Sequence, residues 1–400
     1  MKNKLTFSIL LVSTLIILLF LGNSPLHNEG IYPQMELFSK VMAIIQQNYV
    51  KEVSVKKLIE GALEGMLSSL DPYSQFMPPE VYQEVKIETE GKFGGVGMVI
   101  TRKEGIITVI SPLEDTPAFR AGIKPGDRII EINGESTKGW TTTQAAHKLR
   151  GEPGTEVTIK IWREKEEKFL TITLTREIIH IKSVKDPEVL EEGIGYLRIS
   201  AFREDTDEEL RKALEVLKEK RVKALILDLR NNPGGLLQQA VEVSDIFLPP
   251  EKLVVYTEGR NRTNRKNYYS RHPALFTSPF PVVIMVNEGS ASASEIVAAA
   301  LKDWKVGILL GEKTFGKGSV QSIIPIDEEY HIRLTTAYYY APFGECIEGK
   351  GLVPDIEVPL TPEEEEKVWE AILEGKREDD IQLKKAIEFL KQEMAKLGSG

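Results

Sequence analysis

Residues 282–304 read VVIMVNEGSASASEIVAAALKDW, and this stretch decides the fold of the carboxyl-terminal half of the chain. Its first five residues form a short apolar run, which predicts a buried strand. A helix is predicted from Ser294 to Trp304, with a turn of small residues before it. Such a turn, between a buried strand and a helix, is where an α/β enzyme presents a nucleophile close to helix N–H groups.

The sequence around this stretch alternates strands and helices from residue 193 to 360. Helices are predicted after Thr206, which forms a capping-box pattern with Glu209, and from Leu236 to Phe247. Repeated strand–helix units predict a largely parallel sheet with helices on its faces, which is the α/β fold class. The predicted strands cover residues 196–199, 224–229, 282–286 and 306–310.

The rest of the chain divides by composition. Apolar residues at helical spacing predict helices within residues 31–90. From Gly91 the sequence becomes short strands separated by turns, at 96–101, 105–110, 127–132 and 156–162, with a short helix at 142–149. The tail is charged and helical, typical of a surface or dimer-contact helix. The predicted domains are an N-terminal segment 1–30, a helical segment 31–90, a β-rich domain 91–176, an α/β core 177–360 and a helical segment 361–400.

The composition of the 400-residue chain is that of a globular protein, with 42% hydrophobic and 28% charged residues. Its net charge of −9 argues against a nucleic-acid partner. Cys346 is the single cysteine, so no intramolecular disulfide can form. A catalytic cysteine needs an activating neighbour, and nothing beside Cys346 in the sequence suggests one.

The N-terminus carries Lys2 and Lys4, followed by an uncharged apolar run from Leu5 to Gly22. This run approaches the ~20 residues that span a bilayer. No cleavage site of the Ala-x-Ala kind follows it, which favours an uncleaved signal anchor over a cleaved signal peptide. In either case we expect the chain beyond residue 30 to lie outside the cytoplasm.

Three serines alternate in the predicted turn, and each is a candidate nucleophile: Ser290, Ser292 and Ser294. One of the last two is equally a candidate N-cap of the helix. A hydroxyl nucleophile needs a base, and no histidine lies in a recognisable triad motif. A histidine brought close only by folding stays open as the base. The five histidines are His27, His147, His180, His272 and His331.

A second glycine-rich turn, residues 311–318, follows the next predicted strand and contains Lys317. The ends of neighbouring parallel strands meet at one edge of a sheet, so Lys317 is a candidate base for the serine turn. Lysine acts as a base only when it is neutral, and burial in a dry pocket lowers its pKa. Gln321 is placed to orient the amine by hydrogen bonding.

The lysine turn also nearly matches a phosphate-binding P-loop, but Gly318 occupies the position that requires Ser or Thr. The residues after it read as a strand, whereas a P-loop opens a helix.

A third turn, residues 230–235, contains Gly234 and Gly235, whose N–H groups can approach a ligand closely. With the N–H of Ala293, one of them would form an oxyanion hole. A simple β-to-α turn is the alternative.

Together these turns resemble the carboxyl-terminal processing, or tail-specific, protease family. The resemblance implies a serine–lysine dyad of Ser292 and Lys317 with Gln321 assisting. It also implies an oxyanion hole from Ala293 and from Gly234 or Gly235, and no metal, nucleotide or other cofactor. The core would resemble the crotonase and Clp-protease sheet. Cys346 departs from the small polar residue that is more usual there. The matching motifs are DLRNNPGG at 228–235, SASASE at 290–295, GEKTFGKG at 311–318 with Gln321, and GKGLVPD at 349–355.

The β-rich domain resembles a PDZ domain, inserted between the helical segment and the core. The resemblance implies that a loop and strand hold the C-terminal carboxylate of a peptide in backbone N–H groups. It also implies that Arg150 helps to couple peptide docking to the active site. The peptide-binding residues would be Phe93, Gly94, Gly95, Val96 and Gly97.

We therefore expect a serine endopeptidase anchored to the bacterial cytoplasmic membrane through residues 5–22, on its periplasmic or cell-surface side. It would bind the free C-termini of protein or peptide substrates and cut upstream of them. By resemblance, residues 33–90 and the C-terminal helix would form a homodimer. The alternative is a PDZ scaffold at the membrane whose protease core is inactive. Retention of the serine, lysine and glutamine together argues against that alternative.

Overall fold

The computed structural model describes residues 30–398, apart from residues 114, 186, 261–263, 277–278 and 375–376. The apolar run 5–22, predicted as a membrane anchor, lies outside the described residues. None of the described helices combines the length and the apolar character needed to cross a membrane. The chain divides into two compact units, one up to Phe76 and one from Met77 onward.

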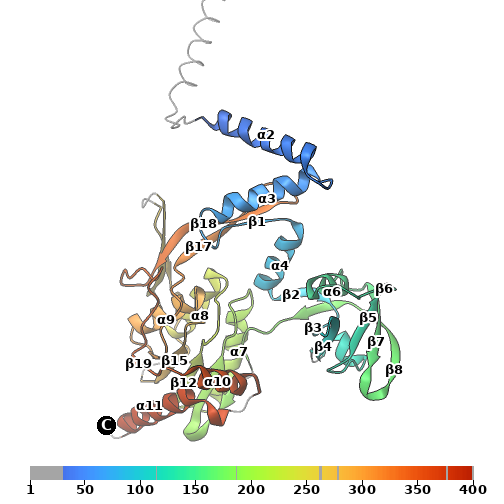
Figure 1. Ribbon diagram of the computed structural model, residues 1–400. Coiled ribbons are helices and arrows are strands. Elements are labelled where there is room, and N and C mark those ends of the chain that lie inside the picture. The colour runs from blue at the N-terminus through green and yellow to red at the C-terminus, as the bar shows by residue number, and fades with distance from the viewer. Residues whose placement is uncertain are drawn as a thin grey trace, which may run out of the picture. The chain divides into compact units, whose positions relative to one another are not determined.

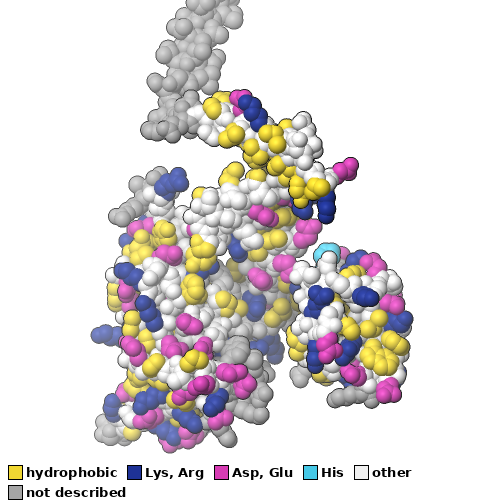
Figure 2. All heavy atoms as spheres, in the orientation of Figure 1, with side chains coloured by type: hydrophobic (Ala, Val, Ile, Leu, Met, Phe, Trp, Pro, Cys, Tyr) yellow, Lys and Arg dark blue, Asp and Glu magenta, His cyan; other side chains and the backbone are white. Residues whose placement is uncertain are grey.

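The first unit is helical, as predicted (Figure 1). It contains α2 (Ile31–Asn48) and α3 (Val55–Ser68). The side chain of Ser54 caps α3, because it accepts a hydrogen bond from the Lys57 N–H at 3.2 Å. Figure 2 shows hydrophobic side chains along α2, where the exposed large ones are Ile31, Tyr32, Met35, Leu37, Val41 and Ile44.

The β-rich domain forms an antiparallel sheet in the order β3-β4-β5-β7-β8, with β6 on β5, while β2 pairs with β9. It follows the short strand β1 (Gln75–Met77) and helix α4 (Pro79–Glu90). Its elements are β2 (Lys92–Gly95), β3 (Met98–Lys103), β4 (Ile106–Pro112), α5 (Pro117–Arg120), β5 (Arg128–Ile132), β6 (Glu135–Ser136), α6 (Thr142–Leu149), β7 (Glu156–Arg163), β8 (Lys168–Thr175) and β9 (Glu177–His180).

The predicted strand 96–101 begins two residues later, at Met98. Gly97 has a φ of +74°, a left-handed conformation that ends regular extended backbone. A Cβ atom at this position would lie 2.3 Å from the Cβ of Thr116, so only glycine fits here. The predicted helix 142–149 is confirmed as α6, which begins with a reciprocal capping box between Thr141 and Gln144.

The α/β core has a six-stranded sheet in the order β10-β11-β12-β15-β16-β19. All neighbouring pairs are parallel except β10 with β11, which confirms the predicted parallel sheet. The core also contains further strands and helices. The elements are β10 (Glu188–Val189), β11 (Ile194–Arg198), α7 (Thr206–Glu219), β12 (Ala224–Asp228), α8 (Leu237–Phe247), β13 (Leu253–Gly259), β14 (Lys266–Tyr269), β15 (Val282–Val286), α9 (Ala293–Asp303), β16 (Ile308–Gly311), β17 (Ser319–Pro325), β18 (His331–Tyr340), β19 (Ile356–Glu357), α10 (Pro362–Glu374) and α11 (Ile381–Gly398).

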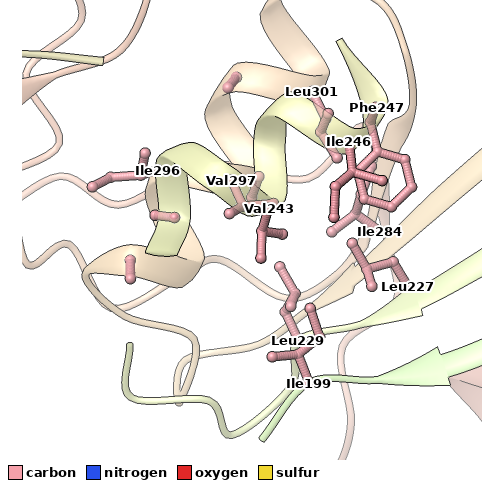
Figure 3. Close-up of a cluster of buried hydrophobic side chains, with 14 of the residues drawn as sticks. Ile199, Leu227, Leu229, Val243, Ile246, Phe247, Ile284, Ile296, Val297 and Leu301 are labelled. Carbon is pink, nitrogen blue, oxygen red and sulfur yellow. The ribbon is translucent and has the colours of Figure 1, made fainter. Parts of the chain in front are cut away.

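Helices α7, α8 and α9 cover one face of this sheet. Alternate strand residues such as Leu227 and Ile284 point toward them and pack against Val243 and Val297 (Figure 3). These side chains are wholly buried. Burying one such side chain stabilises the fold by roughly 1.5–3 kcal/mol, so this cluster holds the strand ends in fixed positions.

Helix α11 covers the other face of the sheet. Leu383, Ala386 and Leu390 are buried there against the remaining strand residues, such as Ile226 and Met285. Helix α11 is therefore a surface helix, as expected, with one face buried against the sheet. Its charged residues occupy the solvent side, while the apolar stripe closes the core.

A buried ionic cluster joins α11 to the end of β12. Arg230 is 1% exposed and donates to both oxygens of Asp380 at 3.1 and 2.7 Å, and to Gln382 at 3.1 Å. It also donates to Asp228 at 2.7 Å, which accepts from the Tyr196 hydroxyl. Burial alone would raise the pKa of Asp228, but Arg230, together with Arg198 and the Tyr196 hydroxyl, outweighs it and lowers that pKa to about 2. The turn after β12 is thereby held by the C-terminal helix.

The predicted capping box of Thr206 and Glu209 is wrong. Helix α7 does begin at Thr206, but the Thr206 hydroxyl accepts from the Arg203 N–H at 2.8 Å. The Glu209 carboxylate accepts from the N–H groups of Ser183 and Val184, both at 2.8 Å. Glu209 therefore binds residues far away in the sequence instead of capping its own helix. These two hydrogen bonds tie the segment at Ser183 and Val184, where the chain enters the core, to α7.

A second sheet of the core contains β17, β18, β13 and β14 in that order, all antiparallel. It includes the predicted strand after the lysine turn, which is β17 and not a helix. The structural requirement for a P-loop, a helix opening at this point, is therefore not met.

Candidate active site

Three turns lie together at the carboxyl edge of the parallel sheet, as the sequence predicted. They are residues 230–235 after β12, 287–292 after β15 and 312–318 after β16. The three strands are neighbours, with Asp228 opposite Met285 and Val286 opposite Gly311. The serine turn therefore lies between the other two turns.

Two of the three candidate serines have structural hydrogen bonds. Ser290 is completely buried and donates to the carbonyl of Leu229 at 2.8 Å. Ser294 is also completely buried and donates to the carbonyl of Asn232 at 2.9 Å. Both side chains therefore fasten the serine turn to the turn after β12.

Ser292 differs from both neighbours. It is half-buried and has a φ of 55° and a ψ of −115°, a conformation rarely adopted by a residue with a side chain. Backbone strain of this kind costs of order 1–3 kcal/mol and is concentrated at functional sites. A sharp, strained strand-to-helix turn is also how α/β hydrolases expose a serine nucleophile.

Glu295 links the serine turn to the lysine turn. It is fully buried, and its Oε2 accepts from the N–H groups of Ser292 and Lys317, both at 2.9 Å. Its Oε1 accepts from the Gly316 N–H at 2.7 Å and the Thr314 hydroxyl at 2.6 Å. One carboxylate thus holds four donors from two turns.

Tyr339, on β18, holds the same two residues by their carbonyl groups. Its hydroxyl lies 3.1 Å from the Ser292 carbonyl oxygen and also contacts that of Lys317. The Tyr339 side chain is 1% exposed, and burial raises its pKa well above the usual value, so the hydroxyl stays a proton donor. Together, Tyr339 and Glu295 hold the N–H and the carbonyl of both Ser292 and Lys317.

Burial also raises the pKa of Glu295, which the four hydrogen bonds to its carboxylate oppose. We call Glu295 and Tyr339 the backbone clamp.

The predicted oxyanion donors lie beside Ser292. A Cβ on Gly234 would lie 2.7 Å from the Ser292 Cβ and 2.8 Å from the Ala293 nitrogen, so only glycine fits. The Gly234 N–H donates to Asn232 at 2.9 Å. Within the described part of the chain, the N–H groups of Gly235 and Ala293 have no acceptor. Of the three predicted donors, Gly235 and Ala293 are therefore the ones whose N–H groups lack an acceptor among the described residues.

Gln321 lies on β17, where the pairing with β18 shifts register between Val320 and Gln321. Its side-chain amide donates to the hydroxyl of Ser319 at 3.1 Å and to that of Thr335 at 3.4 Å. These bonds fix the orientation of the amide group near the lysine turn.

The predicted peptide-binding loop follows β2. Phe93, Gly94 and Gly95 belong to β2, while Val96 and Gly97 connect it to β3. Among the described residues, the N–H groups of Val96 and Gly97 have no acceptor, although the Val96 side chain is buried. A cavity of about 1020 Å³ lies alongside, between β2, α6 and α4.

Arg150 lines this cavity and connects the two sides of it. Its guanidinium lies 5.0 Å from the centre of the Phe93 ring, and it forms an ion pair with Glu84 of α4 at 2.5 Å. Arg150 therefore contacts both the predicted peptide-binding strand and the helix that precedes the domain.

The sequence interpretation gave no role to the backbone clamp. Glu295 was part of the matched SASASE motif, so the signal was present but was not read as a long-range contact. Tyr339 carried no signal, because a tyrosine in a strand is most often a packing residue.

Substitution of each serine should separate nucleophile from scaffold. We expect Ser292→Ala to abolish peptide cleavage, while Ser290→Ala and Ser294→Ala keep most of it and each lose about 1 kcal/mol of unfolding free energy. Steady-state cleavage and thermal unfolding of the three variants measure both effects. A Ser290→Ala or Ser294→Ala variant as inactive as Ser292→Ala, but fully folded, would contradict the assignment.

A serine turn and a lysine turn at one edge of an α/β core, joined to a β-rich domain, are the features of a serine protease with a peptide-binding module. The model of Peptidase family S41 matches residues 193–358, and a PDZ-domain model matches residues 108–163. The model of the activating protease CtpB N-terminal domain matches residues 23–81. The chain belongs to peptidase family S41 and is a serine protease.

Similar proteins agree with this family. The carboxy-terminal-processing protease of Bartonella bacilliformis is 38% identical over 92% of this chain and 91% of its own length. The carboxy-terminal processing protease CtpB of Bacillus subtilis is 36% identical over 81% of this chain and 68% of its own. A Bacteroides fragilis structure described as an S41 protease matches the fold with a TM-score of 0.50 and 16% identity, covering 88% of this chain and 97% of that one. The α/β core with a PDZ domain is thereby confirmed.

Proposed function

We propose that the protein is an endopeptidase in which Ser292 is the nucleophile and Lys317 is its general base. The observation that carries the proposal is the backbone clamp, because it holds both residues by the same two side chains, Glu295 and Tyr339. A dyad needs two side chains held in a fixed relative geometry, and fixing both backbones supplies this.

The proposed reaction is acyl transfer. Neutral Lys317 takes the Ser292 hydroxyl proton as the oxygen attacks the scissile carbonyl, and the protonated lysine then gives a proton to the leaving amine. The N–H groups of Ala293 and Gly235 stabilise the oxyanion, since the Gly234 N–H already has an acceptor in Asn232. Water then hydrolyses the acyl-enzyme, and Gln321 helps to orient the lysine.

The PDZ domain is proposed to select substrates by their free C-terminus. The unpaired N–H groups of Val96 and Gly97 support this, because a carboxylate is the ligand that such a pair accepts. Arg150 then couples peptide docking to α4 through its ion pair with Glu84. Residues 5–22 would tether the enzyme to the cytoplasmic membrane, with its catalytic core outside the cytoplasm. The exposed apolar face of α2 would contribute to a homodimer.

This selection is tested by changing the C-terminal group of a peptide substrate. Two peptides with the same sequence, one ending in a carboxylate and one in an amide, should differ about tenfold or more in kcat/KM, since the amide removes the charge that the N–H groups bind. The difference should appear mainly in KM. Equal cleavage of the two peptides would remove C-terminal recognition from the proposal and leave the dyad standing.

A further inference from the structure

The hairpin of β13 and β14 carries several cations and a single acidic residue, Glu258, in a protein whose net charge is negative. From residue 259 to residue 287 the sequence has no Asp or Glu, although the whole chain has a net charge of −9. Within the described residues of this stretch, the exposed cations are Arg260, Arg265, Lys266 and Arg271. We call these four residues the basic hairpin surface.

One of these cations is held in place. The Arg265 guanidinium lies 3.5 Å from the centre of the Tyr256 ring, which stacks on Tyr340 at 4.9 Å. Its Nε donates to the Asn267 side chain at 2.8 Å. The two terminal nitrogens of the guanidinium do not take part in that bond. An arginine stacked in this way loses little conformational entropy when it binds a carboxylate.

No carboxylate of the described residues neutralises this surface. None of its four cations forms an ion pair there, whereas Arg230 and Lys302 of the core do have acidic partners. A cavity of about 250 Å³ beside β14 is lined by Lys266 and Arg271 together with Tyr268 and Tyr269. The surface thus combines unpaired positive charge, aromatic rings and a concave site.

The strand register places the base of this surface near the active site. Gly259, next to Arg260, pairs with Ala337 of β18, and Ala337 pairs with Val320 of β17. Val320 precedes the assisting Gln321. Neighbouring strands lie about 4.8 Å apart, so two steps across the sheet cover about 10 Å. A peptide extended through the active site can reach that far with about three residues.

We propose that the basic hairpin surface is an exosite that binds an acidic segment of the polypeptide substrate beside the scissile bond. This proposal rests on the endopeptidase function proposed above and adds a charge preference to it. A substrate is favoured over a membrane as the partner, because the surface is linked by strand register to the strand of Gln321. The net negative charge of the protein would otherwise repel an acidic substrate, and the exosite supplies a local positive charge that attracts it.

The test compares two peptides that share the scissile residues and the free C-terminus. One carries a cluster of Asp and Glu beside the scissile bond, and the other carries Asn and Gln there. With the full chain in neutral detergent, we expect kcat/KM to be about tenfold higher for the acidic peptide at low salt, and the preference to shrink as salt rises.

Arg265→Glu/Lys266→Glu should abolish or reverse this preference and leave cleavage of the neutral peptide unchanged. Arg102→Glu/Lys103→Glu, which changes the same charge at exposed residues of β3, is the matched control and should keep the preference. If both variants kept the same preference for the acidic peptide, the exosite would be overturned, while the proposed endopeptidase function would stand. Loss of cleavage of both peptides by the wild-type enzyme would instead contradict the endopeptidase.

A membrane partner has its own outcome. If the hairpin variant leaves the peptide preference intact but removes a stimulation of cleavage by anionic lipid vesicles relative to neutral ones, the surface binds lipid headgroups and the substrate exosite is overturned.

Discussion

Lys317→Ala is expected to lower kcat/KM by about a thousandfold while the protein stays folded. General base catalysis contributes typically 10²–10⁴ in rate, and alanine removes the base without touching the backbone bonds of residue 317 to Glu295 and Tyr339. The fold should survive because the lysine turn is held by main-chain bonds. Cleavage of a C-terminal peptide substrate and far-UV circular dichroism measure the two halves of the prediction.

Lys313→Ala is the matched control, because Lys313 is exposed in the same turn. This variant should cleave normally. A Lys317→Ala enzyme with near-normal turnover would show that another base acts, and a histidine brought close by folding would then be sought. Among the described histidines, His272 is hydrogen-bonded to Asp245 and His331 stacks on Tyr82.

Glu295→Gln is expected to lower kcat by about a hundredfold with little change in KM. The carboxylate accepts from four donors, and an amide has only one oxygen, so its NH₂ group would face at least one N–H donor. Each buried donor left without an acceptor costs about 1–3 kcal/mol. The strained Ser292 backbone should relax, since it persists only while its surroundings hold it.

Glu295 acts through the backbone of other residues, so the readout must separate misalignment from unfolding. Glu288→Gln, an exposed glutamate of the same turn, is the control and should be fully active. The Glu295→Gln enzyme should still bind a peptide C-terminus through the PDZ domain with wild-type affinity. If its kcat were normal, the clamp would be packing alone and would not position the dyad.

Local patterns predicted the secondary structure that places the site. The strand 282–286 was found with the predicted bounds, and the helix after it begins one residue earlier than expected. The strand is wholly buried, as is the helix from Ala293 to Leu301, so their apolar character is continuous and easy to read. The parallel order of β12, β15 and β16 followed from the repeated strand–helix units.

The contacts that shape the site could not be predicted in the same way. Glu209 resembles an N-terminal helix residue with a local capping role, yet its carboxylate binds N–H groups far away in the sequence. Glu295 forms the local bond to Ser292 and in addition binds the distant N–H groups of Gly316 and Lys317. Arg230 and Asp380 likewise meet only because α11 folds back over the sheet. Such pairs depend on tertiary structure, which periodicity and turn chemistry do not encode.

The choice among the three serines has a physical basis in the structure that the sequence lacked. Ser290 and Ser294 have carbonyl acceptors and no exposure, while Ser292 has the strained backbone. The choice of Ser292 by resemblance and this difference point in the same direction.

Covalent labelling with a fluorophosphonate tests the central claim most directly. Such a probe reacts with a serine only when a base activates it and an oxyanion site stabilises the adduct. We predict that mass spectrometry finds one adduct, on Ser292, in the wild-type chain, and finds none in Ser292→Ala or Lys317→Ala. Labelling of Lys317→Ala at the wild-type rate, or an adduct on a different serine, would contradict the account.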